Sequence, residues 1–283
     1  MNVSRRLRRT AVLTIAASCL SLVGCPAASS REVTDVTAGR TPVFVADFRP
    51  DSLGTPSGWG WQSGAYSRCT SNPGEHKLDV LTRSSAFAMQ DGALTITAHP
   101  RPDGQWNTGL LTTGDSCSSG GSGFQERTGD LVVAHVRLPD SIQGAWPSLW
   151  SWRAGASEVD LMEWHSAAPH RLEFVNHVRP TSLLWTSSRL VRPGAWLWVG
   201  VQLGAQRVTW YVGTTLSGIT PEWHDDSGVG SHFAAYPVIS LSVDDGTTYP
   251  RPTRSAHISF TLDAFRVYRP TASATVAKAS RQR

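Results

Sequence analysis

The chain has 283 residues, a formal net charge of +4 and 17% charged residues, with 25 glycines and 17 prolines between short apolar segments. This composition excludes a coiled coil and an intrinsically disordered protein. Four arginines before Cys25 account for the net positive charge, since residues 41–270 hold 17 basic and 20 acidic residues. Nucleic-acid binding is disfavoured, because it requires a cationic surface that displaces counterions from phosphates.

The first 24 residues have the form of a signal peptide. A basic start precedes an apolar run, Ala11–Val23, that is too short to span a bilayer comfortably. Leu22-Val23-Gly24-Cys25 resembles the bacterial lipobox, in which the cysteine becomes the lipidated first residue of the mature protein. We expect export and a lipid anchor at Cys25 on the outer face of the bacterial cell membrane. An ordinary secretory peptide, which leaves the protein extracellular, is the alternative, and Sec or twin-arginine export stays open.

Residues 25–41 are small and polar and predict a tether between the anchor and a folded domain. From residue 42 to residue 270, short apolar runs alternate with polar residues at a period of two and are separated by turn signals such as Asp91-Gly92. This pattern predicts one all-β sandwich or jelly-roll domain. Residues 271–283 contain no aromatic residue and predict a disordered tail. The runs expected as strands are Val43–Phe48, Ala93–Ala98, Leu131–Leu138, Val159–Met162, Trp196–Leu203, Arg207–Val212, Val238–Val243 and His257–Tyr268.

Two of the four cysteines remain for the folded domain. Cys19 leaves with the signal peptide and Cys25 would carry the lipid, so that Cys69 and Cys117 predict a disulfide in an oxidising compartment. No cysteine pair or histidine cluster has the spacing of zinc ligands, and we expect no metal at the site.

The segment Glu158-Val159-Asp160-Leu161-Met162-Glu163 carries three closely spaced acids. On a regular strand, Glu158 and Asp160 share one face, whereas Glu163 falls on the opposite face. One β-bulge near Leu161 and Met162 would return Glu163 to the face of the other two acids. Crowded carboxyls repel one another, and this repulsion raises the pKa of at least one of them. A retaining glycosidase needs such a difference, because its nucleophile must be ionised while its acid is protonated. A solvated acidic face is the alternative interpretation.

Tryptophans surround this acidic segment, and the chain has 12 of them in all. Trp146 and Trp150 precede the acids and Trp164 follows them directly. Indole rings stack on the C–H groups of pyranoses, so we expect these three to contact substrate. Four further tryptophans are expected to belong to the core: Trp152, Trp196, Trp198 and Trp210.

The segment Gly144–Trp150, followed by the acidic segment, resembles glycoside hydrolase family 16 in its laminarinase-like branch with the bulged E-x-D-x-x-E pattern. The resemblance covers about residues 43–269 and implies a concanavalin-like jelly-roll sandwich of two antiparallel sheets with a concave sugar-binding cleft. It implies that Glu158 is the nucleophile, Asp160 its orienting partner and Glu163 the acid/base. By the same resemblance Trp146 and Trp150 line donor subsites and His177 is a cleft histidine. The family's Arg and Glu before a Leu-Pro pair are missing at Gly129–His135, so the substrate is less closely indicated.

The expected function is therefore an exported, endo-acting, retaining β-glycanase that acts on β-1,3-glucan or a related β-glucan. Transglycosylation on the same fold is a variant, and a lectin-like binding module without turnover is the alternative from another class. We expect no cofactor; a structural calcium ion near Asp47 and Asp263 is left open. The expected partners are a polysaccharide and, through the lipid anchor alone, the membrane, and we expect a monomer.

Overall fold

The computed structural model describes residues 35–46, 48–54, 58–71, 76–140, 143–178, 181–186 and 189–271. The chain divides into two units, Met1–Glu32 and Val33–Arg283, and the described residues belong to the second. The predicted signal peptide, Cys25, the start of the predicted tether, Asp47 and residues 272–283 lie outside the described residues. Among the residues described, no helix has the length and hydrophobicity needed to cross a membrane.

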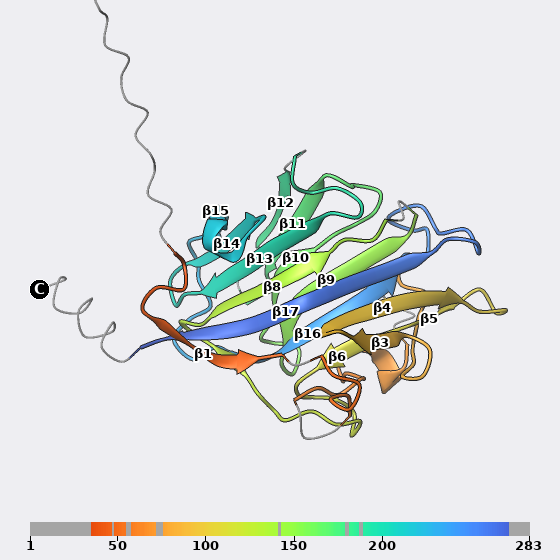
Figure 1. Cartoon of the computed structure of the whole chain (residues 1–283), viewed down its shortest axis with the longest axis horizontal. Coiled ribbons are helices and arrows are strands. Elements are labelled where there is room, and N and C mark those ends of the chain that lie inside the picture. The colour runs from red at the N-terminus through yellow and green to blue at the C-terminus, as the bar shows by residue number, and fades with distance from the viewer. Residues whose placement is uncertain are drawn as a thin grey trace, which may run out of the picture. The chain divides into compact units, whose positions relative to one another are not determined.

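The described part of the chain is almost entirely β-structure (Figure 1). Helical structure there is confined to two 3-10 turns, η1 (Ser67–Cys69) and η2 (Leu216–Gly218). The strands are β1 (Arg40–Val45), β2 (Asp79–Leu81), β3 (Phe87–Gln90), β4 (Ala93–Pro100), β5 (Trp106–Thr108), β6 (Leu110–Thr112), β7 (Glu126–Arg127), β8 (Leu131–Arg137), β9 (Ala145–Trp152), β10 (Val159–Glu163), β11 (Arg171–Asn176), β12 (Thr181–Thr186), β13 (Trp196–Leu203), β14 (Val208–Gly213), β15 (Thr220–Asp225), β16 (Ala234–Val243) and β17 (Ile258–Pro270).

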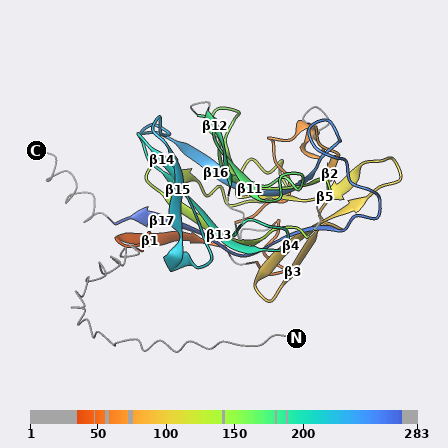
Figure 2. The same cartoon turned by 90° about the horizontal axis from the view of Figure 1, so that it is seen from above.

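These strands form two sheets that lie in separate layers (Figure 2). The larger sheet has the order β15-β14-β13-β8-β17-β4-β5-β2, with β1 on β17 and β3 on β4. The smaller sheet has the order β12-β11-β10-β9-β16-β6, with β7 on β16. All strand pairs in the described residues are antiparallel except β2 with β5. The expected sandwich of two antiparallel sheets is confirmed with this one exception.

The core lies between the two sheets and follows from the period-two patterns. Along β4, Leu94, Ile96 and Ala98 are buried, while Thr95 and Thr97 on the other face bond to hydroxyls of β17. Burying each large aliphatic side chain contributes about 1.5–3 kcal/mol. The alternation therefore fixes which face of each strand packs inward.

The tryptophans of β13 and β14 divide between core and surface. Trp210 is fully buried, as expected. Trp196 is 39% exposed, so its expected place in the core is wrong. Leu197 occupies the adjacent inward position of β13, so that Trp196 and Trp198 point outward and stack on His135 at 4.7 and 4.9 Å between ring centroids.

Strand β10 contains the bulge that the acidic segment predicts. Against β9, Asp160 pairs with Trp150 and Met162 pairs with Leu149, which leaves Leu161 as the extra residue. Both Leu161 and Met162 are buried in the core. One extra inward residue returns Glu163 to the face of Asp160, and the predicted bulge is confirmed.

Candidate active site

A cleft of about 140 Å³ lies over the smaller sheet. Its floor comes from the adjacent strands β9, β10 and β16, and one wall comes from the loops around η1 and before β2. The lining residues are Ala65, Tyr66, Lys77, Ser148, Trp150, Trp152, Glu158, Asp160, Glu163 and Ser240. The three acids of the predicted site therefore line one cleft.

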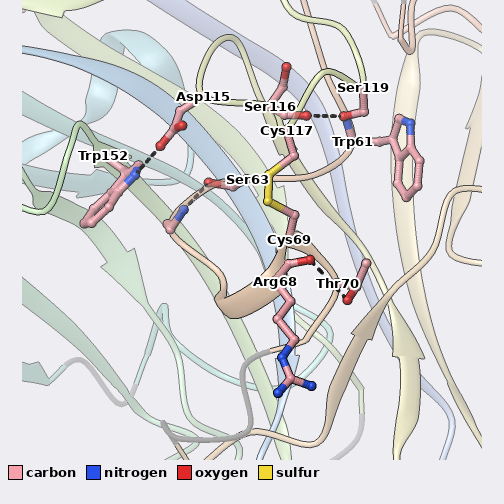
Figure 3. The surroundings of a disulfide bond; sticks show 11 residues. Trp61, Ser63, Arg68, Cys69, Thr70, Asp115, Ser116, Cys117, Ser119 and Trp152 are labelled. Atoms are coloured by element: carbon pink, nitrogen blue, oxygen red, sulfur yellow. Dashed lines mark hydrogen bonds between the residues drawn. A yellow bond between two sulfur atoms is a disulfide. The ribbon is translucent and has the colours of Figure 1, made fainter.

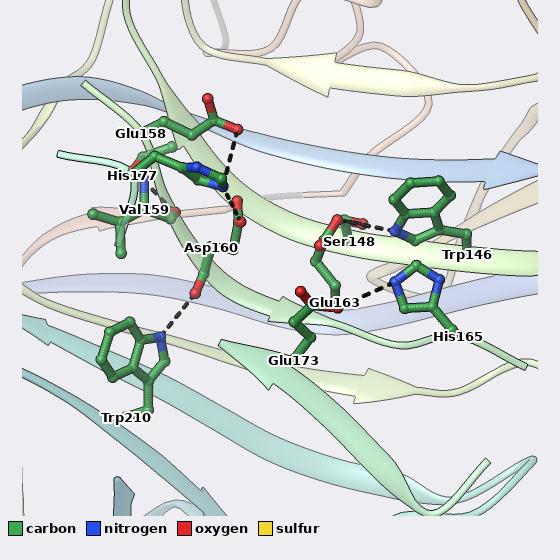
Figure 4. Close-up of polar contacts among 11 residues, drawn as sticks. Trp146, Ser148, Glu158, Val159, Asp160, Glu163, His165, Glu173, His177 and Trp210 are labelled. Carbon is green, nitrogen blue, oxygen red and sulfur yellow. Dashed lines mark hydrogen bonds and ion pairs between the residues drawn. The ribbon is translucent and has the colours of Figure 1, made fainter. Parts of the chain in front are cut away.

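Glu158, Asp160 and His177 form one polar group in this cleft (Figure 4). His177 Nε2 lies 3.1 Å from Asp160 Oδ2 and 4.0 Å from Glu158 Oε1. The backbone amide of His177 donates to the carbonyl of Glu158, and the Trp210 indole donates to the carbonyl of Asp160 at 2.8 Å. These contacts hold the backbone of Glu158 and Asp160, so that the packing around β10 positions their carboxyls.

The Asp160 carboxyl and the His177 imidazole hold their protons more tightly than isolated side chains do. Burial raises the pKa of Asp160 from 3.8 to about 8, and the charges of Glu163 and Glu158 add to this shift. The hydrogen bond to Asp160 raises the pKa of His177 from 6.5 to about 9. Because the two groups share a hydrogen bond, they titrate as a pair. Near neutral pH the pair keeps protons beside Glu158 and limits the negative charge there.

We expect the His177 imidazole to titrate with a midpoint near pH 9, and Asp160→Asn to move that midpoint toward 6.5 because the hydrogen bond to a carboxylate is lost. Both folded-state pKa values are raised. Their contribution to stability is therefore complete below the unfolded values of 3.8 and 6.5 and is lost as the pH rises through 8 for Asp160 and 9 for His177. NMR titration of the imidazole signals in the two proteins measures the shift. An unchanged midpoint in Asp160→Asn would contradict the pairing.

Glu163 lies further along the cleft and has different neighbours (Figure 4). Its Oε1 accepts hydrogen bonds from the Trp146 indole at 2.9 Å and from the Ser148 hydroxyl at 3.0 Å. Trp146 and Ser148 both belong to β9, which pairs with β10. One carboxylate oxygen is thus held by the neighbouring strand, and the side chain is only half-buried, so the carboxyl can exchange a proton with a molecule in the cleft.

The tryptophans near the acids take three different positions. Trp150 lines the cleft and its indole donates to Ser240 at 3.1 Å. Trp152, expected in the core, also lines the cleft, and it donates to Asp115 at 2.7 Å. Trp164 is 0% exposed and its indole donates to the carbonyl of Pro169, so the expectation that it contacts substrate is wrong. The bulge returns β10 to regular alternation at Glu163, which turns the next side chain inward.

Several cleft residues were not predicted because they come from loops far away in the sequence. Tyr66 contributes its ring to the wall and donates its hydroxyl to the buried Asp79 at 3.1 Å. Burial raises the pKa of Asp79 to about 6, against the opposing charge of Lys77. The Lys77 ammonium lies 4.5 Å from the centre of the Trp146 ring and 5.5 Å from that of Tyr66. A cation–π contact in a loop leaves no periodic signal in the sequence.

The predicted disulfide Cys69–Cys117 is present and joins two loops at the edge of the cleft (Figure 3). One loop carries Tyr66 and the other carries Asp115, the partner of Trp152. The backbone is left-handed at Arg68, Cys69, Asp115, Cys117 and Ser118, a conformation that costs free energy for residues other than glycine. The disulfide therefore holds a strained junction beside the cleft.

Replacing both cysteines by serine is expected to lower the free energy of unfolding by about 3–4 kcal/mol, because the bond closes a loop of 48 residues. Amide hydrogen exchange in residues 63–71 and 113–120 should accelerate by more than the lower global free energy of unfolding explains. In the strands of the larger sheet, exchange should accelerate only as much as that global change requires. Denaturant unfolding and exchange mass spectrometry measure both effects. Uniform acceleration over the domain would contradict a local role of the disulfide.

Two groups of side chains bring three metal-ligand atoms within 4.8 Å of one another: Glu158 with Asp160 and His177, and Glu163 with His165 and Glu173. For the calcium site left open above, Asp263 Oδ1 contacts His135 Nδ1 at 2.7 Å, and Asp47 is outside the described residues.

Comparison with solved structures identifies the fold. The endo-β-1,3-glucanase of Pyrococcus furiosus aligns with a TM-score of 0.63 and 15% identity over 82% of this chain and 95% of that one. SCLam, a non-specific endo-β-1,3(4)-glucanase from family GH16, aligns with a TM-score of 0.63 and 15% identity over 83% and 92%. LamA from Zobellia galactanivorans, solved with laminaritriose and laminaritetraose, aligns with a TM-score of 0.62 and 17% identity over 81% and 99%.

No protein-family model and no curated protein matches the chain by sequence. At 15–17% identity, these alignments establish the fold alone. The described domain has the jelly-roll sandwich fold of family 16 glycoside hydrolases, as the sequence motifs indicate.

Proposed function

We propose that this chain is an exported, endo-acting, retaining β-glycanase, and that its substrate is β-1,3-glucan or a related β-glucan. The observation that carries the proposal is the bulge at Leu161, which leaves Glu158, Asp160 and Glu163 in one cleft between tryptophans. Sugar affinity alone does not require two further acids beside Asp160, whose charges help to raise the pKa of its carboxyl. The glucanases with the same fold support the choice of substrate.

The reaction proceeds in two displacements. In the first, the Glu158 carboxylate attacks the anomeric carbon, the bond to the leaving sugar breaks, and Glu163 gives its proton to the leaving oxygen. In the second, Glu163 takes a proton from water, the water oxygen attacks the anomeric carbon, and the bond to Glu158 breaks. Each step inverts the anomeric carbon, so that the product retains its configuration. A second sugar in place of water gives transglycosylation.

The Asp160–His177 pair supports the nucleophile without touching the sugar. Because burial keeps Asp160 protonated at neutral pH, its carboxyl adds no second negative charge beside Glu158. His177, within 4.0 Å of Glu158 Oε1, supplies positive charge that stabilises the carboxylate both before attack and as leaving group.

A panel of polysaccharides tests the proposal: linear β-1,3-glucan, mixed-linkage β-1,3-1,4-glucan, cellulose and a galactan, each incubated with purified residues 33–271. We expect oligosaccharides of intermediate length early in the digestion of a β-1,3-containing glucan, since an endo-acting enzyme cuts internal bonds. Chromatography by size resolves the products. Binding to a glucan without any product would instead identify a lectin-like module.

We also propose that the mature protein is lipid-anchored through Cys25, since Leu22-Val23-Gly24-Cys25 resembles a lipobox. Cys25→Ser should release the protein from the membrane fraction and leave specific activity unchanged, because residues 25–41 separate the anchor from the domain. Immunoblots of membrane and soluble fractions measure the distribution, and Cys19→Ser, inside the signal peptide, is the matched control. Full membrane retention of the Cys25→Ser protein would contradict this anchor.

A further inference from the structure

Glu163 also belongs to a second polar group, whose other members, His165 and Glu173, have no role in the two displacements. Glu163 on β10 pairs directly with Glu173 on β11, so that two carboxyls face each other across neighbouring strands. Like charges in directly opposed positions destabilise a sheet. His165 lies beside them, and Figure 4 shows the three side chains gathered away from Glu158 and His177.

His165 is buried, and its polar contacts point to an unfilled ligand position. The residue is 7% exposed and its ring packs against Trp146 and Tyr249, at 4.5 Å between centroids in both cases. Its Nδ1 has no hydrogen-bond partner among the described residues. Its Nε2 faces Glu173 Oε2 at 3.6 Å, which is too long for a hydrogen bond. Nε2 is therefore the nitrogen that faces the carboxyls without a hydrogen bond among the described residues, and it is available to a ligand there.

We propose that Glu163, His165 and Glu173 bind a divalent transition-metal ion, with Zn²⁺ as the best match. Zinc is held by imidazole nitrogen and carboxylate oxygen at about 2.0–2.2 Å, which separates two ligand atoms of a tetrahedral site by about 3.4 Å. The 3.6 Å between His165 Nε2 and Glu173 Oε2 fits this separation, and a carboxylate oxygen of Glu163 lies within 4.8 Å of the ligand atoms of both residues. Water from the cleft completes the shell. The bound ion removes the repulsion between the two carboxyls.

The other group of possible ligands, which consists of Glu158, Asp160 and His177, is less suited to a metal ion. His177 Nε2 already makes a hydrogen bond of 3.1 Å to Asp160, which a metal would have to break. A metal at His165 would instead coordinate Glu163 and prevent it from exchanging a proton with the leaving sugar. Zinc would thus inhibit the proposed glycanase reversibly. Metal binding itself does not depend on the proposed function; only the inhibition does.

Isothermal titration of the protein with ZnCl₂ in a non-chelating buffer tests the site. We expect one ion per chain at this site, and an affinity lowered about 100-fold or more in His165→Asn and in Glu173→Gln, since each removes a ligand. Glu173→Gln keeps the size of the side chain, and circular dichroism verifies the fold of both variants. His177→Asn, the matched control from the other group, should bind zinc like the wild type.

A second measurement follows glucan hydrolysis with and without zinc. Zinc should inhibit the wild type, EDTA should restore the rate, and Glu173→Gln should resist the same zinc concentration. No zinc binding to the wild type, wild-type affinity in His165→Asn and Glu173→Gln, or loss of binding in His177→Asn would overturn the proposed site. Zinc binding that depends on Glu173 in a protein without glycanase activity would leave the site standing and refute the proposed function.

Discussion

Glu158→Gln is expected to lower kcat on the best glucan by about 10⁴-fold or more, because an amide of nearly the same shape cannot attack the anomeric carbon. The fold should survive, since the Glu158 side chain is partly exposed in the cleft and the backbone contact with His177 does not involve the carboxylate. Reducing-end assays give kcat and KM. Glu222→Gln, the same chemical change on β15 of the other sheet, is the matched control and should retain the full rate.

Glu163→Ala distinguishes the role of the general acid from that of the nucleophile. This variant should lose most of its activity on glucan, whose leaving sugar needs a proton, and much less on aryl glycosides with acidic leaving groups. Glu158→Gln should fail on both kinds of substrate. Near-wild-type turnover of glucan by Glu158→Gln would refute its assignment as nucleophile, and equal losses on both substrates in Glu163→Ala would refute its assignment as acid.

Deleting residues of the bulge is also expected to change the activity strongly. Deleting Met162 places Glu163 four positions after Glu158 on a regular strand, and both carboxyls stay on the cleft face. We expect a folded protein that is destabilised by about 2–5 kcal/mol, because a buried side chain is lost, and has reduced activity. Deleting Leu161 together with Met162 should abolish activity, because a spacing of three turns Glu163 toward the core.

The comparison is the relative rate of the two deletion variants after circular dichroism and thermal unfolding show which fraction is folded. Each rate is divided by the concentration of folded protein, so that a difference in stability between the two variants does not change the comparison. Equal rates in the single and double deletions would mean that the facing of Glu158 and Glu163 does not govern the chemistry.

The sequence predicted those parts of the fold and site that depend on local periodicity. The bulge followed from the facing of Glu158, Asp160 and Glu163, and the disulfide followed from counting cysteines; both are present. Period-two patterns also located eight of the seventeen strands in the described residues. These features are legible because each depends on residues close together in the chain or on a small set of alternatives.

The predictions that failed depend on tertiary contacts. Trp164 and Trp152 each stand beside predicted site segments, yet the first is buried and the second lines the cleft beside Asp115. Tyr66 and Lys77 reach the cleft from a loop that a disulfide fastens to another loop. Glu173 faces Glu163 only because β11 pairs with β10 in one register. Spacing in the sequence does not encode such pairs.

Covalent trapping would identify the residue that attacks the anomeric carbon. A β-glucan oligosaccharide with fluorine at C2 and a good leaving group slows the second displacement and accumulates the glycosyl-enzyme. Mass spectrometry of the digested protein should find the sugar on the peptide that contains Glu158, and Glu158→Gln should carry no label. A label on any other residue, or glucan cleavage with inverted configuration and no label, would refute a retaining mechanism with Glu158 as nucleophile.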